Sequence, residues 1–501
     1  MLRVVNELKT PLRRGFSSVN LYNYTSGRWV YNDALRHKER RAVFHVDGLE
    51  SVNQTFNDVV RLSKLAEGGF NRTFLISLRD GRQVVARVPY PMTAPIPNYY
   101  AVASEDQRSC GIPVPEIYGY SADSDNIAGI PYILMEFVHG PSSLTQLEAK
   151  MMSHSFPAGG SLYLASDLEK VATVGVPLED KRFCVGPDTK LSLWHGRRAG
   201  LNVGRGPYHS AEAALMGAAQ KELAYLKQFG QPLLPLRRER RPIFKYQAQS
   251  PSDHVENLER YLGITASLVP RDPALSRFCI RHPDLQPNNI FVSWSPDSDC
   301  KIVSLFDWQH TSIPPMFLLA GIPQRLQNHA DDVSHSMIVP SRPDNIDEMD
   351  EAQRDNEEYR YRCRLVHYHY VTSTKKLFLH AGGPWTGETL DLKVALIEAK
   401  NRWEELAGRG ALCPFDFDAT DVEETMAMEE VMIKMTRGFE ILQSMQDVGE
   451  EGWVLAEDYE RAVAFFKEYK EEALAGAETA EEREEILGHW PWDDMDEEMY
   501  M

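Results

Sequence analysis

Residues 281–309, RHPDLQPNNIFVSWSPDSDCKIVSLFDWQ, decide the fold of this chain. Two short runs in this stretch, NNIFVSW and KIVSLF, are rich in β-branched and aromatic residues and therefore predict two strands. The polar SPDSD between them has turn chemistry, so we expect the two strands to form a β-hairpin. In a hairpin the second strand ends beside the start of the first strand. Asn289, at the start of the first strand, is therefore expected near Asp307, at the end of the second.

Three polar side chains surround this hairpin. Amide and carboxylate oxygens at adjacent strand ends suit a hard cation such as Mg²⁺, so Asn289 and Asp307 are the predicted metal ligands. Asp284, in the loop before the hairpin, is then able to face a hydroxyl nucleophile near that metal and is the predicted catalytic base. The spacing H-x-D-x-x-x-x-N, followed by a hairpin and an Asp, is the layout of a kinase catalytic loop. The alternative is a surface turn whose Asp and Asn cap local backbone.

The segment upstream supplies groups that suit phosphate. Residues 52–90 predict a helix followed by strands, with a hairpin turn at residues 79–82. Gly68 and Gly69, between two strands, allow backbone amides to approach a phosphate closely, although a Gly-Gly pair also serves as an ordinary turn. Arg87 lies among apolar residues in the following strand, where kinases place a phosphate-binding lysine. An arginine can bind phosphate bidentately, and the alternative is a solvated arginine on an edge strand.

Two glutamates complete the predicted nucleotide site. Glu105 follows a Pro-rich loop and is the candidate for a helix glutamate that pairs with the phosphate-binding cation. Glu136 lies in the apolar run YILMEFV, which suits a hinge between two lobes where backbone groups bind the edge of adenine. The alternative for this run is a buried strand that simply ends there.

Composition restricts the class of protein. The chain has 501 residues, of which 43% are hydrophobic and 25% charged, which is typical of a globular protein with an ample core. The net charge of −19 disfavours a nucleic-acid partner. The six cysteines are scattered without a C-x-x-C pair, which fits free thiols in a reducing compartment. No run approaches ~18 consecutive apolar residues, so we expect no transmembrane segment.

The ends of the chain differ in charge. Residues 1–30 contain arginines and almost no acidic residues, which predicts a mitochondrial presequence that is cleaved after Phe16. The expected location is the mitochondrial matrix. The alternative is a disordered basic N-terminus that carries no targeting signal. Apolar spacing predicts helices at 345–381, 389–408, 420–446 and 455–486, and the acidic end from Glu481 is expected to be solvated. The predicted domains are 1–40 presequence and linker, 41–138 N-lobe, 139–410 C-lobe and 411–501 helical extension with acidic tail.

One segment of the C-lobe allows two interpretations. Cations lie beside aromatic residues between Trp194 and Tyr208, in the sequence WHGRRAGLNVGRGPY. This pattern suits either an anion or substrate site, or an insertion whose arginines are paired and packed. The second interpretation is favoured. Residues 211–229 and 254–269 predict two helices that flank this part of the lobe.

The segments EGGFNRTF, VVARVPYP, YILMEFVHG, RFCVGPDTKLSLWHGRR and HPDLQPNNIFV with FDWQ, within residues 65–310, resemble the aminoglycoside phosphotransferase-like (phosphotransferase enzyme) family. More narrowly, the chain is similar to the fungal mitochondrial members named for altered inheritance of mitochondria. The resemblance implies an α+β, protein-kinase-like fold of two lobes: a small antiparallel-sheet N-lobe and a larger, mostly helical C-lobe with a C-terminal helical extension. It also implies transfer of the ATP γ-phosphoryl group with Mg²⁺.

The family's residues map onto this sequence one by one. The resemblance assigns the base to Asp284, the metal ligands to Asn289 and Asp307, the nucleotide cation to Arg87 and the nucleotide loop to Gly68 and Gly69. The expected partners are a nucleotide and a small hydroxyl-bearing substrate in mitochondria. Residues 99–112 and 140–147 are shorter than the family pattern, which shortens the helix behind Glu105. The rival hypothesis is therefore a kinase-like protein with weak or no catalysis that acts as a mitochondrial scaffold or regulator.

Overall fold

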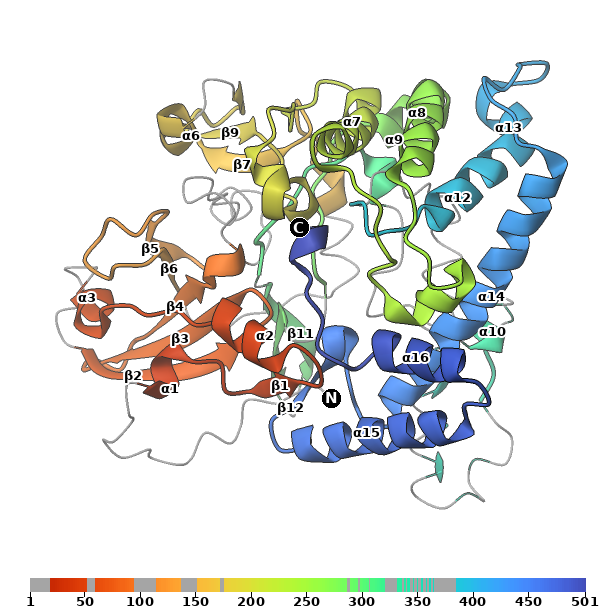
Figure 1. Cartoon of the computed structure of the whole chain (residues 1–501). Helices are drawn as coiled ribbons and strands as arrows, with labels where there is room; N and C mark the ends of the chain where they lie inside the picture. Colours follow the sequence, from red (N-terminus) through yellow and green to blue (C-terminus); the bar gives the residue numbers. More distant parts are fainter. Residues whose placement is uncertain are drawn as a thin grey trace.

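The computed structural model describes residues 19–51, 59–93, 114–136, 151–171, 175–285, 289–295, 298–305, 307–319, 331–335 and 384–501, with a few positions between 338 and 364. Figure 1 shows an antiparallel sheet at the left and helices above and to the right of it. This is the two-lobed, protein-kinase-like α+β arrangement that the sequence predicts. None of the helices in the described part combines the length and apolarity that a membrane crossing requires.

The N-lobe is a five-stranded antiparallel sheet with the strand order β2-β3-β4-β6-β5. Its strands are β2 (Val59–Glu67), β3 (Asn71–Leu78), β4 (Gln83–Pro89), β5 (Ile117–Ser121) and β6 (Tyr132–Glu136). Alternate residues of β3, such as Phe74 and Ile76, point into the core, as the period of two in a strand requires. The predicted turn at residues 79–82 and the strands on both sides of Gly68 and Gly69 are confirmed. Residues 52–58, at the start of the segment where a helix is expected, lie outside the described residues, and the chain is strand β2 from Val59 onward.

The C-lobe combines a small sheet with several helices. The strands β7 (Ser161–Leu164), β8 (Val176–Pro177) and β9 (Phe183–Gly186) form a sheet with the order β7-β9-β8. The helices are α6 (Ala165–Val171), α7 (Ala211–Phe229), α8 (Pro251–Leu268), α9 (Pro273–Ser276), α10 (Asp332–His335), α12 (Leu390–Asn401) and α13 (Trp403–Ala407). The core between α7, α8 and α12 contains Tyr261, Leu396 and Trp385.

Two of the three arginines between Trp194 and Tyr208, Arg198 and Arg205, are buried, whereas Arg197 is exposed. Arg198 forms a bidentate pair with Glu222 at 2.7 and 3.0 Å, and both side chains are fully buried. Arg205 lies 3.9 Å from the centre of the Trp194 ring and donates to backbone carbonyls. A guanidinium whose donors are satisfied in this way has little left for a free anion. The interpretation of this segment as a packed insertion with paired arginines is therefore confirmed.

A C-terminal extension packs against the N-terminal segment, residues 19–51. Its elements are α14 (Ala419–Ser444), β12 (Trp453–Leu455), α15 (Tyr459–Gly476) and α16 (Ala480–His489). They confirm the helix predicted at 420–446, whereas the single helix predicted at 455–486 is two helices, α15 and α16. The N-terminal segment contains α1 (Val19–Tyr22), β1 (Gly27–Trp29), α2 (Asp33–Glu39) and α3 (Val46–Ser51). Strand β1 pairs with β12 in an antiparallel register. Most of the helix expected at 345–381 lies outside the described residues.

The expectation of a solvated acidic tail is wrong for residues 489–501, which we call the C-terminal tail. Glutamates of α16 are exposed, but Trp490, Trp492 and Tyr500 are 8%, 6% and 6% exposed. The Trp492 ring stacks on Phe466 at 4.2 Å between ring centres. Charge alone predicts solvation, whereas these aromatic rings remove a large apolar area from water when they pack. The aromatic residues, not the acidic ones, therefore decide where the tail lies.

The C-terminal tail lies between the N-terminal segment and the C-lobe. On one side, Asn32 donates to Asp494 and Glu497, and Arg36 pairs with Glu497 at 2.7 Å. On the other side, the Tyr500 hydroxyl donates to the Leu234 carbonyl at 2.8 Å. Figure 1 accordingly places the C-terminus in the middle of the molecule, beside α7. The tail thus bridges two parts of the fold.

Buried His254 makes stability depend on pH. Burial lowers its pKa from 6.5 to about 4, and its Nδ1 lies 2.8 Å from the Thr389 hydroxyl. The unfolded chain therefore binds a proton between these two values that the folded chain does not, so stability is complete above about pH 6.5 and falls as the pH drops toward 4. We expect a loss of about 2 kcal/mol between about pH 7.5 and about pH 5, measured by urea denaturation. His254→Gln, which does not titrate, should reduce this dependence; an unchanged pH profile in that variant would contradict the assignment.

Candidate active site

The hairpin predicted at residues 289–305 is present. It consists of β10 (Ile290–Ser295) and β11 (Ser298–Leu305), which pair in an antiparallel register with Ile290 opposite Leu305. Asn289 immediately precedes the first strand, and Asp307 follows the second by two residues. The register therefore brings both predicted metal ligands to the same end of the hairpin.

Side-chain contacts define the loop that carries Asp284. The Asn289 amide donates to the Asp284 carbonyl at 2.9 Å and to its carboxylate at 3.0 Å. His282 is 3% exposed, accepts from the Asp284 backbone N–H at 3.2 Å, and lies edge-on to the Trp308 ring. His282 therefore binds backbone within this loop and has a structural role. These contacts hold the Asp284 carboxylate beside Asn289.

Asp307 has an unusual backbone conformation and pairs with a residue far away in the sequence. Its φ of 68° is in the left-handed region, which costs free energy for a residue other than glycine and often marks functional sites. Its carboxylate forms an ion pair with the Arg87 guanidinium, 220 residues earlier in the chain. The two side chains are 26% and 13% exposed, so water screens the pair only in part. This contact joins β4 of the N-lobe to the end of the hairpin.

Two residues that the sequence reasoning missed extend this contact. Asn71 is 6% exposed, and the orientation of its amide is assigned from its neighbours: the oxygen then accepts from Arg87 at Nε (3.2 Å) and at Nη2 (2.6 Å). Its amide nitrogen donates to Gln309 Oε1 at 2.9 Å. The signal in the sequence was the position of Asn71, directly after the glycine pair in EGGFNRTF. Gln309 had no such signal.

The Gly68–Gly69 loop is a tight connection between β2 and β3. The Gly68 N–H donates to the Asn71 carbonyl at 2.9 Å. Neither glycine has a left-handed φ. A Cβ added at Gly69 would have no atom within 4 Å, and a Cβ added at Gly68 would contact only the Asn71 carbonyl oxygen, at 3.7 Å. The turn itself therefore does not require glycine at either position. Close approach of a ligand to the exposed backbone is a physical reason for small residues there.

The base of this loop is anchored by Glu67, whose side chain is fully buried. One carboxylate oxygen accepts from the backbone N–H and hydroxyl groups of Thr25 and Ser26 at 2.8 to 3.1 Å. The other accepts from Lys64 at 2.8 Å and from Arg72 at 3.0 Å. Burial acts to raise the pKa of Glu67, but these hydrogen bonds outweigh it and lower the pKa. The N-terminal segment is thereby tied to the start of the glycine loop.

The two predicted glutamates have different outcomes. Glu136 ends β6, where its backbone N–H donates to the Glu116 carbonyl at 2.8 Å and its carboxylate accepts from the Glu116 N–H at 3.2 Å. These contacts stabilise the end of the strand. Glu105 and the segment predicted as the hinge after Glu136 lie outside the described residues.

The segment after Asp307 packs against the C-lobe sheet. His310, which also has a left-handed φ, lies with Nδ1 2.9 Å from the Thr189 carbonyl, and burial lowers its pKa. The Ser312 hydroxyl donates to Asp188 at 2.5 Å, and burial raises the pKa of that carboxyl. Phe70 of the glycine loop meets the His310 ring edge-on at 5.7 Å between ring centres. The end of the hairpin thus lies between the glycine loop and the sheet of β7 and β9.

The donor set fits a magnesium ion held together with phosphates. Asp284 and Asp307 carry carboxylates, and Asn289 has an amide oxygen in addition to the nitrogen that binds Asp284. Among the described residues, no three His, Cys, Asp or Glu side chains gather closely enough to form a metal centre alone. Mg²⁺ is commonly bound by one or two carboxylates plus substrate phosphates, which matches this set.

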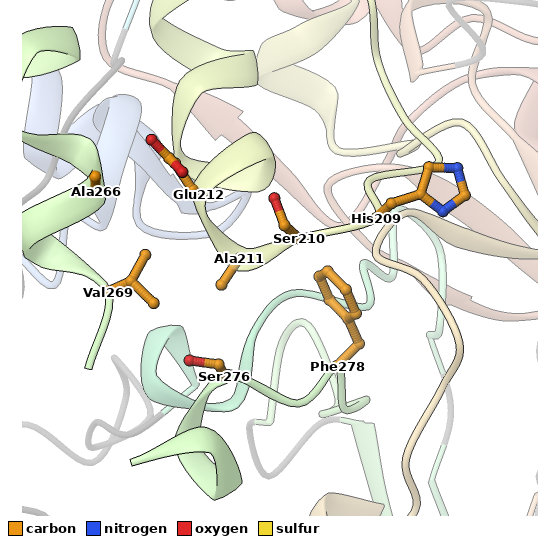
Figure 2. A pocket seen from close by; sticks show the side chains of 8 residues that line it. All are labelled: His209, Ser210, Ala211, Glu212, Ala266, Val269, Ser276 and Phe278. Carbon is orange, nitrogen blue, oxygen red and sulfur yellow. The ribbon is translucent and has the colours of Figure 1, made fainter. Parts of the chain in front are cut away.

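One cavity lies away from these residues. It has a volume of about 430 Å³ and is lined by the first turn of α7, the end of α8, Ser276 and Phe278. Figure 2 shows His209, Ser210 and Glu212 on one side of this space and Val269 with Ser276 on the other. None of the predicted site residues lines the cavity. The chemistry of the hairpin end, rather than the cavity, therefore identifies the candidate site.

Comparisons with known proteins agree with the resemblance found in the sequence. No profile of a known protein family matches the chain. A subtelomeric hrmA-associated cluster protein of Aspergillus fumigatus is 27% identical over 516 residues, which cover 87% of this chain and 97% of that protein. The altered inheritance of mitochondria protein 9 of Yarrowia lipolytica, a mitochondrial protein by name, is 23% identical over 523 residues, covering 94% and 84%. This chain is similar to the altered inheritance of mitochondria 9 proteins.

Among solved structures, aminoglycoside phosphotransferase APH(4)-Ia is 15% identical, covers 72% of this chain and 97% of its own, and has a TM-score of 0.27. A chain described as a fructosamine-3-kinase from Thermobifida fusca is 12% identical with a TM-score of 0.27, and the match covers 76% of this chain and 100% of that one. The sequence relatives in Yarrowia lipolytica and Clavispora lusitaniae carry mitochondrial names.

Proposed function

We propose that this protein is an ATP- and Mg²⁺-dependent phosphotransferase that transfers a phosphoryl group to a hydroxyl group of a small molecule in mitochondria. One set of contacts supports the proposal: Asn289 binds Asp284, the hairpin register puts Asp307 at the same end of the hairpin, and Arg87 from the N-lobe pairs with Asp307. A cation, two carboxylates and an amide beside an open glycine loop are the groups that phosphoryl transfer requires.

Each residue has a role in this proposal. Asn289 and Asp307 hold the metal ion, and Arg87 with the backbone of Gly68 and Gly69 binds the phosphates. When bound, Mg²⁺ neutralises the charge that develops on the phosphoryl oxygens. Asp284 orients the acceptor hydroxyl and takes its proton, and its contact with Asn289 fixes the carboxylate for that task.

The pair between Arg87 and Asp307 changes partners in this reaction. Both ions are half-buried, so each is stable only while an opposite charge is close. Asp307 would pair with bound Mg²⁺ and Arg87 with the bound phosphates. We therefore propose that the ion pair closes the site in the free protein and opens when Mg·ATP enters.

Calorimetry with Mg·ATP tests the proposal. We expect the wild-type protein to bind Mg·ATP and Asp307→Ala to lose at least about 2 kcal/mol of binding free energy, because the variant lacks a metal ligand and leaves Arg87 without its partner. Asp180→Ala, which removes an exposed carboxylate paired with Arg182 far along the chain, is the control and should bind as wild type does. An absence of Mg·ATP binding in the wild-type protein would refute the proposed activity.

The rival function is a kinase-like scaffold or regulator without turnover. The observation that favours it is the Arg87–Asp307 ion pair. Because Arg87 neutralises the carboxylate that would bind the metal, the two charges are paired even when no nucleotide is bound. The two functions differ in turnover. A screen of small hydroxyl metabolites for ATP-dependent phosphorylation, performed with wild type, separates them.

The mitochondrial location is supported by two observations. Residues 1–30 have the composition of a presequence, and the relatives in Yarrowia lipolytica and Clavispora lusitaniae are mitochondrial by name. A reporter fused to residues 1–40 is expected to enter the matrix. A diffuse cytosolic signal would contradict this part of the proposal.

A further inference from the structure

Asn71 occupies the position where the glycine loop, the phosphate-binding cation and the hairpin end meet. It is the first residue of β3 and directly follows the loop of residues 68–70. In the β3–β4 register Thr73 lies opposite Arg87 and Asn71 lies opposite Pro89. Residues two apart on a strand share a face, so Asn71 and Arg87 are diagonal neighbours on the same face of the sheet. Gln309, its other partner, follows Asp307 by two residues in the chain.

The contacts of Asn71 require both the oxygen and the nitrogen of its side-chain amide. Its oxygen accepts from Nε and Nη2 of Arg87, and its nitrogen donates to Gln309. An aspartate at this position can accept but cannot donate, and a leucine can do neither. Asn71 is 6% exposed, so water cannot replace the lost partners easily. The amide therefore fixes the guanidinium relative to both the loop and the Asp307 segment.

An arginine, rather than a lysine, suits this arrangement. A guanidinium has five N–H donors in one plane, whereas an ammonium group is a compact charge on a flexible stem. Arg87 contacts Asn71 through Nε and Nη2, and Nη2 also contacts Asp307. When the pair with Asp307 opens, the contact with Asn71 remains and still sets the plane of the guanidinium.

We propose that Asn71 is a positioning residue for phosphate binding: it orients the Arg87 guanidinium toward the phosphates of the nucleotide and joins the glycine loop to the Asp307 segment through Gln309. This inference rests on the proposed function. Its consequence is selective: Asn71 contributes to affinity for the phosphates and not to affinity for the nucleoside.

The test compares ligands with and without phosphates by calorimetry. We expect Asn71→Leu to weaken Mg·ATP binding about tenfold or more, because Arg87 loses a defined orientation, and to change adenosine binding less than about twofold. Gln309→Leu should produce a smaller change of the same kind. The control is Asn257→Leu: Asn257 is also a buried asparagine, lies in α8 and donates to Thr389, and its loss should lower stability without altering the ratio of the two affinities.

The outcomes separate the two proposals. If wild type does not bind Mg·ATP, the proposed function is wrong and this inference with it. If wild type binds Mg·ATP and Asn71→Leu binds it equally well, or loses ATP and adenosine affinity in the same proportion, only the positioning role is wrong. Where Asn71→Leu fails to fold, Asn71→Ser, which is smaller and polar, is measured with the same expected ratio.

Discussion

Asp284→Asn is expected to lower the rate of phosphoryl transfer by about 100- to 10,000-fold, the usual contribution of a positioned general base. An amide in this position cannot take the proton of the acceptor hydroxyl. It can still accept a hydrogen bond from Asn289, so the loop around His282 should keep its shape. Binding of Mg·ATP should change little, because the metal ligands and Arg87 remain. The large effect on rate and the small effect on binding together assign Asp284 to the chemical step.

The measurement is a steady-state assay with the acceptor that the metabolite screen identifies, run beside calorimetry of Mg·ATP. Asp180→Asn makes the same chemical change at an exposed carboxylate outside the site and should retain the wild-type rate. A rate for Asp284→Asn within about tenfold of wild type would exclude the role of general base.

Trp492→Ala is expected to destabilise the fold by about 3 to 5 kcal/mol, the usual range for truncating a buried tryptophan. The indole is 6% exposed and stacks on Phe466 and on Phe439, with ring centres 4.2 and 5.0 Å apart. Truncation to alanine leaves a cavity among these rings, which the surrounding helices fill only in part. Because the same packing fixes the C-terminal tail, the N-terminal segment should loosen as well.

Denaturant unfolding followed by circular dichroism measures this loss, and hydrogen exchange of residues 27–36 reports the loosening of the N-terminal segment. Leu487→Ala is the control, because Leu487 is an apolar residue of α16 that is 51% exposed, so its removal should change stability by less than about 0.5 kcal/mol. A loss below about 1 kcal/mol for Trp492→Ala would contradict the packing described for the tail.

The tail also reaches the candidate site indirectly. Its Asp494 and Glu497 bind Asn32 and Arg36, and the same N-terminal segment presents Thr25 and Ser26 to Glu67 at the base of the glycine loop. Arg36, Glu497 and Glu67 are buried or half-buried charges, which are costly to leave without their partners. The two ends of the chain therefore support the N-lobe beside the site.

The sequence alone was sufficient to predict the features that depend on residues close together in the chain. Alternating apolar residues and turn chemistry predict the hairpin of β10 and β11, and the three-to-four spacing of apolar residues predicts α7, α8 and α14. The same local spacing brings Asn289 and Asp307 to one end of the hairpin, because an antiparallel register follows from the turn. The side chains expected at this end were therefore predictable before the fold was known.

Only the tertiary structure decided the contacts between residues distant in the chain. The Arg87–Asp307 pair spans 220 residues and the Asn32–Asp494 contact spans 462, and no periodic pattern records either of them. The hydrogen bonds of Asn71 likewise depend on how β3 meets the segment after β11. For the tail, counting charges predicted solvation, because the aromatic surface that buries Trp492 exists only after α14 and α15 have packed. Local patterns determine the elements and their polar ends, whereas the complementary surfaces that pair those ends form only on folding.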